Sequence, residues 1–197
     1  MLWKVLAVIL SYFIGNFSTS IIVSKLWAGI DIRKYGSGNA GATNVLRTLG
    51  LKAGLVTFVG DALKAILSVW LGDKLGGENV ALLCGIAVVM GHNWPLLLGF
   101  KGGKGIASSI GVGLYVHPMV AIICIAIGIL IVAKTKYVSL GSVVAISLLP
   151  ILLLFVQFKL FLFGLALAAM AIYRHRENID RLLKGTEPKL GQKSRIK

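Results

Sequence analysis

Acidic residues are scarce in this 197-residue chain. Seven Asp and Glu stand against 21 Lys and Arg, which gives a formal net charge of +14 at pH 7. Such a balance favours an anionic partner, either membrane lipid or nucleic acid. The basic residues are dispersed among apolar stretches and are not gathered on one polar domain. We therefore expect membrane lipid as the partner and no nucleic acid.

Cysteine is also rare. Cys84 and Cys124 both lie inside apolar runs, which argues against a disulfide framework and against a cysteine metal site. His, Asp and Glu show no cluster with the spacing of metal ligands, so we expect neither a metal nor a cofactor. Apolar residues, in contrast, make up 57% of the chain, and the mean hydropathy is +0.87. These values are too high for a soluble domain of this length.

Seven apolar segments predict an all-α integral membrane protein with seven transmembrane helices, forming one polytopic domain over residues 1–197. Several segments are shorter than the roughly 20 residues that cross a bilayer upright, so short or broken helices are expected. No small-residue cleavage pattern follows the first segment, which therefore predicts a membrane span and not a signal peptide. The segments are 3–24, 53–72, 79–92, 105–117, 118–133, 138–156 and 159–173.

The junction His117-Pro118 decides the topology. As a turn it gives seven spans, and as a kink it gives six. With seven spans and the N-terminus outside, 17 of the 21 Lys and Arg lie inside, three lie outside, and Lys64 lies within a span. A six-span arrangement would place Lys134, Lys136 and the basic tail on opposite sides. The positive-inside rule therefore favours seven spans with the C-terminus in the cytoplasm.

This topology places three polar segments on the cytoplasmic side, and the first is GSGNAGATNVLR at 36–47. It matches G-x-G-x-x-G, but Asp61, the acidic residue 20 positions on, lies within a span, so a nucleotide site is rejected. Glycines, hydroxyls and amides precede a helix start near Thr43, and Arg47 follows one turn later. That arrangement suits a phosphate or a carboxyl oxygen. The alternative is an ordinary polar surface loop.

The second segment is GHNWPLLLGFKGGKGIA at 91–107. Pro95 interrupts a helix, and the glycines around Lys104 leave the backbone bare beside a fixed positive charge, as phosphate binding requires. The P-loop spacing is absent, so Lys104 would act as a point charge. The alternative role for these lysines is that of a positive-inside anchor, which suits Lys101 better than Lys104. His92 is either a base or a helix-end histidine bonded to a carbonyl.

The third segment is YRHREN at 173–178, which opens a basic cytoplasmic tail over 175–197. A stop-transfer flank would explain the arginines but not His175, Glu177 or Asn178. His175 and Asp180 also form an H-x4-D pair, which we regard as chance because the short tail leaves no room for the large domain of enzymes that use that pattern. The tail itself is expected only to anchor the protein at anionic lipid.

Two smaller features lie within the spans. Asp61 and Lys64 are one helical turn apart, and charges at such depth are expected to pair or to face a wet interior. We favour a structural pair. Ser139 and Ser142 begin the sixth segment on the inside face, where they either bond locally or contact a substrate.

Taken together and in this order, the three polar segments resemble the signature motifs of the bacterial membrane acyl-phosphate:glycerol-3-phosphate acyltransferases. The resemblance covers nearly the whole chain. It implies transfer of a fatty acyl group from acyl phosphate to the 1-hydroxyl of sn-glycerol 3-phosphate at the cytoplasmic membrane. The products would be lysophosphatidic acid and phosphate, in the first acylation of bacterial phospholipid synthesis. Acyl-CoA is not the implied donor. The family context also suggests the acyl-phosphate-forming enzyme as a protein partner, which nothing in the sequence itself indicates.

The chemistry that this resemblance implies requires the protein to juxtapose two phosphorylated substrates and offset their repulsion. Arg47 and Lys104 are predicted to do so, and His175 is a candidate general base, the alternative being a substrate phosphate oxygen. Asn178 would bond a carbonyl or hydroxyl oxygen. The predicted catalytic set is Ser37, Arg47, Lys104, His175 and Asn178. The predicted substrate-binding set is Asn39, Gly41, Thr43, Asn44, His92, Gly102, Gly103, Gly105 and Ser142.

The competing class is a transporter or channel for a phosphorylated metabolite, because broken helices and glycine loops suit that function too. The outside loops lack a matching polar set, and no internal repeat is evident. A purely structural membrane protein would leave the three polar segments unexplained.

Overall fold

A computed structural model describes residues 1–192, and these residues fold into α-helices and short 3₁₀-helices without a strand. The elements are α1 (Leu2–Asn16), α2 (Thr19–Ala28), η1 (Ile32–Lys34), α3 (Ala42–Leu49), α4 (Leu51–Gly76), α5 (Glu78–Asn93), η2 (Leu96–Leu98), α6 (Ile106–Val116), α7 (Pro118–Thr135), α8 (Val138–Leu154), α9 (Phe158–Arg174) and α10 (Arg176–Leu183).

The predicted apolar segments coincide with helices, with one difference. The first segment is two helices, α1 and α2, separated by extended backbone at Phe17 and Ser18. Four helical stretches are long and apolar enough to cross a membrane: Leu2–Ala28, Leu51–Gly76, Glu78–Leu98 and Pro118–Thr135. The pair α9 and α10, bent by 62°, is a fifth candidate, and α6 and α8 are apolar but shorter. The all-helical membrane architecture is confirmed, whereas seven spans and their orientation stay predictions.

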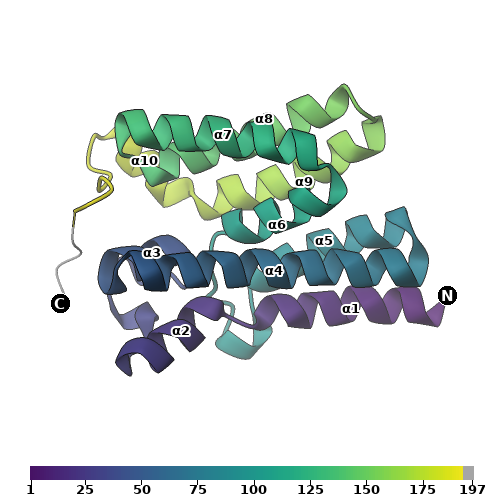
Figure 1. Cartoon of the computed structure of the whole chain (residues 1–197), viewed down its shortest axis with the longest axis horizontal. Helices are drawn as coiled ribbons and strands as arrows, with labels where there is room; N and C mark the ends of the chain where they lie inside the picture. The colour runs from purple at the N-terminus through teal and green to yellow at the C-terminus, as the bar shows by residue number, and fades with distance from the viewer. Residues whose placement is uncertain (193–197) are drawn as a thin grey trace.

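The His117-Pro118 junction is a turn between two helices. α6 ends at Val116, and α7 begins at Pro118, where proline suits the first helical position because its missing N–H would be unpaired anyway. The His117 side chain caps α7 by accepting a hydrogen bond from the Val120 amide at 3.3 Å. The chain reverses its direction here (Figure 1).

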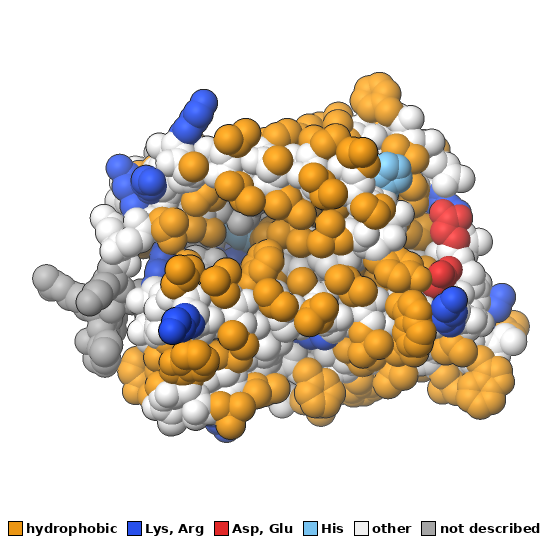
Figure 2. All heavy atoms as spheres, in the orientation of Figure 1, with side chains coloured by type: hydrophobic (Ala, Val, Ile, Leu, Met, Phe, Trp, Pro, Cys, Tyr) orange, Lys and Arg blue, Asp and Glu red, His pale blue; other side chains and the backbone are white. Residues whose placement is uncertain are grey.

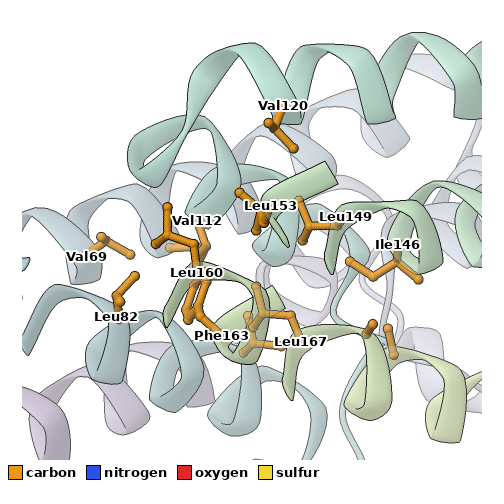
Figure 3. Packing of buried hydrophobic residues seen from close by; sticks show 14 of the residues in the cluster. Val69, Leu82, Val112, Val120, Ile146, Leu149, Leu153, Leu160, Phe163 and Leu167 are labelled. Atoms are coloured by element: carbon orange, nitrogen blue, oxygen red, sulfur yellow. The ribbon is translucent and has the colours of Figure 1, made fainter. Parts of the chain in front are cut away.

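Two groups of long helices lie side by side, with α6 between them (Figure 1). One group contains α1, α4 and α5, and the other contains α7, α8 and α9. Buried aliphatic side chains from both groups and from α6 form the main hydrophobic core, with Val112 of α6 beside Phe163 and Leu160 of α9 (Figure 3). Core packing of this kind holds α6 in place, and the N-terminus of α6 carries the glycine-rich segment.

Glycines allow the helices of the first group to approach closely. A Cβ at Gly91 of α5 would overlap the carbonyl oxygen of Tyr12 in α1, and a Cβ at Gly15 would overlap that of Val88. Small residues at such crossings are typical of membrane helix packing. The close approach places the end of α5, and thus His92, beside the break between α1 and α2.

Apolar side chains dominate the visible face of the molecule, and Lys and Arg are concentrated toward the end where the C-terminus lies (Figure 2). The same end carries α2, α3 and α10 (Figure 1). The first and third polar segments therefore lie at one end of an apolar body.

Candidate functional site

A cavity of about 600 Å³ lies where the three polar segments meet. Each segment contributes to its wall, although the first and the third are more than 100 residues apart in the sequence. The cavity wall includes most of the predicted site residues: Ser37, Asn39, Gly41, Thr43, Asn44, Arg47, His92, Lys104, Gly105, Ser142, His175 and Asn178. Gly102 and Gly103 are not among the residues that line it. Their predicted contact with substrate is therefore not supported by their position.

The first segment is shaped by Asn44. This side chain is buried, and its Nδ2 donates to the carbonyl oxygens of Ile32, Tyr35 and Asn39 at 3.0–3.2 Å. Its Oδ1 accepts from the Ser37 amide at 3.0 Å. Because all of these groups belong to the loop before α3, Asn44 holds the loop that presents Ser37 and Asn39 to the cavity. Its amide is thereby occupied with the protein's own backbone.

Arg47 lies in the last turn of α3 and reaches the cavity wall. One terminal nitrogen of its guanidinium donates to the Pro188 carbonyl oxygen at 2.9 Å. Its Nε is buried and has no hydrogen-bond partner within residues 1–192. Burial lowers the pKa of Arg47, although nearby Glu187 opposes that change, and an arginine stays charged. Arg47 therefore contributes to the cavity wall a guanidinium whose hydrogen-bonding capacity is not filled by the described residues, and this favours an anion in the cavity.

Lys104 lies in the turn before α6, and its ammonium donates to Oδ1 of Asn178 in α10. Burial lowers the pKa of Lys104 to about 8, with Arg181 adding to the effect. A phosphate in the cavity would reverse this shift, because an opposite charge favours the ammonium form.

Arg174 holds the backbone of the glycine-rich turn from behind. Its Nε donates to the Gly103 carbonyl at 2.9 Å, and its terminal nitrogen donates to the Gly102 carbonyl at 3.0 Å. A Cβ at Gly103 would overlap His92 Nε2. Gly102 and Gly103 are therefore needed for close packing, while Lys104 and Gly105 face the cavity.

His175 lies at the bend between α9 and α10. Its Nδ1 lies 2.7 Å from the Ala171 carbonyl oxygen, so Nδ1 carries a proton and Nε2 is left as an acceptor. Burial lowers the pKa of His175 to about 4, although the bond to Ala171 opposes that change. The ring is consequently neutral at pH 7. Asp180, the other half of the H-x4-D pattern, instead pairs with Lys184 at 2.9 Å on the surface.

Glu187 belongs to the cavity wall, although no sequence motif indicated it. Its buried carboxylate accepts hydrogen bonds from Ser139, Asn178 and Arg181 at 2.6–2.7 Å. Burial would raise the pKa of this carboxyl, but the three donors outweigh that effect and lower it. Residues expected to belong to a plain basic tail thus form α10 and part of the cavity wall. The only sequence signal was one acidic residue in a basic stretch, which by itself is uninformative.

Asp61 and Lys64 form the predicted pair, with Lys64 Nζ 2.8 Å from Asp61 Oδ1. Lys64 also contacts His92 Nδ1 at 3.0 Å. Within the described residues the His92 ring therefore contacts Lys64 and Asp61 and not a carbonyl, unlike the helix-end alternative. Asp61 and His92 both line the cavity.

The cavity opens sideways between α4 and α8. Leu51, Leu55 and Phe58 of α4 line one side, with Val138 of α8 on the other. Leu51 is 64% exposed and Leu55 is 53% exposed. A hollow with Lys or Arg and His side chains inside it is visible on this apolar face (Figure 2). Such a site can admit a molecule with an apolar chain and an anionic head.

In the described part of the chain, no three His, Cys, Asp or Glu side chains are grouped so as to hold a metal ion. The cavity wall combines cations and neutral hydrogen-bonding groups with the buried carboxylates of Asp61 and Glu187 and the carboxylate of Glu177.

Comparison with known proteins gives one consistent family. Residues 5–185 match the family described as glycerol-3-phosphate acyltransferase. The chain is 58% identical to a glycerol-3-phosphate acyltransferase of Alkaliphilus metalliredigens over 98% of this chain and 99% of that protein. It is 53% identical to one of Clostridioides difficile over 96% of each protein.

A solved structure also matches. The crystal structure of PlsY (YgiH), an integral membrane glycerol 3-phosphate acyltransferase, in its glycerol 3-phosphate form superposes with a TM-score of 0.90. That protein is 38% identical to this chain, and the match covers 95% of this chain and 96% of that one. A lysophosphatidic acid form of PlsY matches with a TM-score of 0.88.

Proposed function

This chain belongs to the glycerol-3-phosphate acyltransferase family of integral membrane enzymes, and on that premise we propose its donor, its regiochemistry and its site residues. The protein transfers a fatty acyl group from acyl phosphate to the 1-hydroxyl of sn-glycerol 3-phosphate. The products are 1-acyl-glycerol 3-phosphate (lysophosphatidic acid) and inorganic phosphate. This is the first acylation of phospholipid synthesis, carried out at the cytoplasmic face of the bacterial inner membrane.

The observation that carries this proposal is the composition of one cavity. Arg47, Lys104 and Arg181 surround a space of about 600 Å³ that also opens onto an apolar lateral face. Both proposed substrates carry phosphate, and one of them carries a fatty chain. The cations offset the repulsion between the two phosphates, and the lateral opening admits the chain from the bilayer.

The reaction needs little covalent chemistry from the protein. The glycerol O1 attacks the acyl carbonyl carbon, the new C–O ester bond forms, and the bond between that carbon and the phosphate oxygen breaks. Phosphate leaves with the bonding electron pair. Arg47, whose Nε has no protein partner within residues 1–192, stabilises negative charge on the donor. Lys104, beside the glycine turn, binds the phosphate of the acceptor, and Ser37, Asn39 and Thr43 orient substrate oxygens.

The proton of the attacking hydroxyl goes to a phosphate oxygen in this scheme. His175 has a pKa near 4, whereas the second ionisation of a phosphate monoester lies near ~6. The phosphate is thus the stronger base by about two units at equilibrium. His175 is neutral, and its free Nε2 accepts a hydrogen bond from the other glycerol hydroxyl, which orients the acceptor so that the O1 proton faces the phosphate oxygen. Asn178, fixed between Lys104 and Glu187, supports the lysine.

Purified protein in detergent or vesicles, given acyl phosphate and labelled glycerol 3-phosphate, tests the proposal. A lipid-extractable labelled product is expected with acyl phosphate and not with acyl-CoA. Product formation with acyl-CoA alone would contradict the donor assignment.

The same vesicles separate the enzyme from the transporter. Labelled glycerol 3-phosphate that accumulates unmodified inside sealed vesicles, without a lipid product, would favour the transporter and overturn the proposal.

A further inference from the structure

Lys64 and Asp61 lie within the apolar body, where charges are costly and tend to mark function. Lys64 has a side chain only 10% exposed, and that of Asp61 is 2% exposed. The acyl transfer outlined above does not use either residue. Their contacts converge on His92, which lines the cavity and is 5% exposed.

The Lys64 ammonium has three protons, and the described residues supply acceptors for all of them. Nζ lies 2.6 Å from the Phe17 carbonyl oxygen, 2.8 Å from Asp61 Oδ1 and 3.0 Å from His92 Nδ1. The Gly15 carbonyl oxygen lies further away, at 3.2 Å. The Phe17 carbonyl lies in the break between α1 and α2, and the Gly15 carbonyl lies in the last turn of α1. Lys64 is therefore held in one place by α1, α4 and α5 together.

This arrangement determines which nitrogen of His92 carries the proton. An ammonium can only donate, so Nδ1 facing Lys64 has to be a bare acceptor. Nδ1 also lies 3.5 Å from Asp61 Oδ1, but that separation is longer than the one to Lys64, and Asp61 already accepts from Lys64 and from Thr19 at 3.0 Å. The proton of a neutral His92 then resides on Nε2.

The Nε2 edge of the ring lies against the glycine-rich turn. A Cβ built on Gly103 would overlap Nε2, and the Gly103 amide donates to the His92 carbonyl oxygen at 3.0 Å. No hydrogen-bond partner for Nε2 occurs within residues 1–192. The next residue, Lys104, is the cation assigned to the acceptor phosphate. A donor at Nε2 would attract a phosphate oxygen bound at this turn, whereas a lone pair at Nε2 would repel it.

We propose that the buried pair Lys64 and Asp61 fixes His92 in the neutral tautomer protonated at Nε2, so that His92 donates a hydrogen bond to the phosphate held at Lys104 and Gly105. Lys64 and Asp61 are positioning residues, and His92 is a phosphate-binding residue. The inference rests on the proposed function for the identity of the phosphate, but the tautomer can be measured without any turnover.

Nitrogen-15 NMR of labelled wild-type protein at pH 7 tests the first half. The chain has three histidines, and the His92 signals are those absent from His92→Gln. We expect one bare nitrogen at Nδ1 and one protonated nitrogen at Nε2, and inorganic phosphate should shift the Nε2 signal. A ring protonated at Nδ1, or at both nitrogens, would overturn the proposal.

Lys64→Met and Asp61→Asn give opposite expectations. Without the ammonium, Nδ1 faces only the Asp61 carboxylate, so in Lys64→Met the proton moves to Nδ1. In Asp61→Asn, Lys64 still donates, and the Nε2 tautomer persists. If Lys64→Met does not fold because Asp61 is left unpaired, Lys64→Met combined with Asp61→Leu removes both charges and both polar groups that face Nδ1, and a mixture of the two tautomers is then expected. A ring unchanged in whichever Lys64 variant folds contradicts the role of Lys64.

Kinetics test the second half. A Gln amide can reproduce a donor near Nε2, whereas an Asn amide is too short. The KM for glycerol 3-phosphate should rise about tenfold or more in His92→Asn, as loss of a charge-assisted hydrogen bond predicts, and clearly less in His92→Gln.

Lys64→Met should raise the KM in the same way, while Lys74→Met, at an exposed lysine in the last turn of α4, should not. Equal values for His92→Gln and His92→Asn would overturn the role of Nε2. Absence of acyl transfer in wild-type protein would instead contradict the proposed function.

Discussion

Arg47 is the residue whose surroundings most clearly favour the binding of an anion. Its Nε is buried without a protein partner in the described residues, and only a backbone carbonyl of the tail engages its terminal nitrogen. Arg47→Ala should lower kcat by about 100-fold or more, the scale of losing a charged donor to a transition state. Labelled-product formation measures this effect in protein whose thermal unfolding is unchanged. Arg176→Ala removes an exposed arginine of α10 and serves as the control. Near-normal turnover of Arg47→Ala would remove Arg47 from the site.

Lys104 predicts a pH dependence. Its pKa is lowered to about 8 from an ordinary value of 10.5, so the ammonium is present below about pH 8 and is lost above it. The kcat/KM for glycerol 3-phosphate should therefore fall as the pH rises through about 8. Lys104→Arg keeps its charge throughout this range and should lack that alkaline fall. A fall retained in Lys104→Arg would assign it to another group.

The acidic side of the dependence of kcat/KM on pH tests the role of His175. With a pKa near 4, it is already neutral through the working range, and the proton acceptor is taken to be a phosphate oxygen. An acidic fall in kcat/KM near pH ~6, reflecting the substrate phosphate, should persist in His175→Gln, although kcat is lower. Disappearance of that fall in His175→Gln would identify His175 as the base.

At the scale of the element, the glycine turn before α6 depends on the absence of side chains. Gly103→Ala would push a methyl group into the His92 ring and toward the Ala40 carbonyl, 3.0 Å away. The KM for glycerol 3-phosphate should rise about tenfold, because a shift of about 1 Å in a binding group costs that much or more. Gly113→Ala, whose nearest contact is the Ala121 methyl at 3.3 Å, is the control within α6. Equal KM values in the two variants would show that the turn does not position the phosphate.

The elements themselves follow closely from local sequence. Pro118 begins α7 as a first-turn proline should, and the apolar runs end where the helices end. The break between α1 and α2 was not anticipated, because no proline or glycine marks Phe17 or Ser18. It forms where Lys64 takes the free carbonyl oxygens, and this is a tertiary contact with a residue 47 positions away.

At the scale of the whole molecule, the orientation in the membrane remains a prediction. In a variant with Cys84 and Cys124 replaced by Ala, single cysteines at Arg176 and at Lys74 should react with an impermeant thiol reagent from opposite sides. Arg176→Cys should be labelled only after the cytoplasmic side is exposed, and Lys74→Cys should be labelled in intact cells. Both labels from the same side, or the reverse pattern, would contradict the proposed topology.

Hydropathy and charge by themselves determined the membrane class, the helix positions and the three polar segments, because burial in lipid acts on each segment locally. The motifs likewise indicated the family and most of the cavity wall. Only the tertiary structure decided that Glu187 enters the site, that Gly102 and Gly103 lie behind it, and that Lys64 contacts His92. These contacts join residues far apart in the chain, and they exist only because the helices pack at particular distances and rotations, which no local pattern specifies.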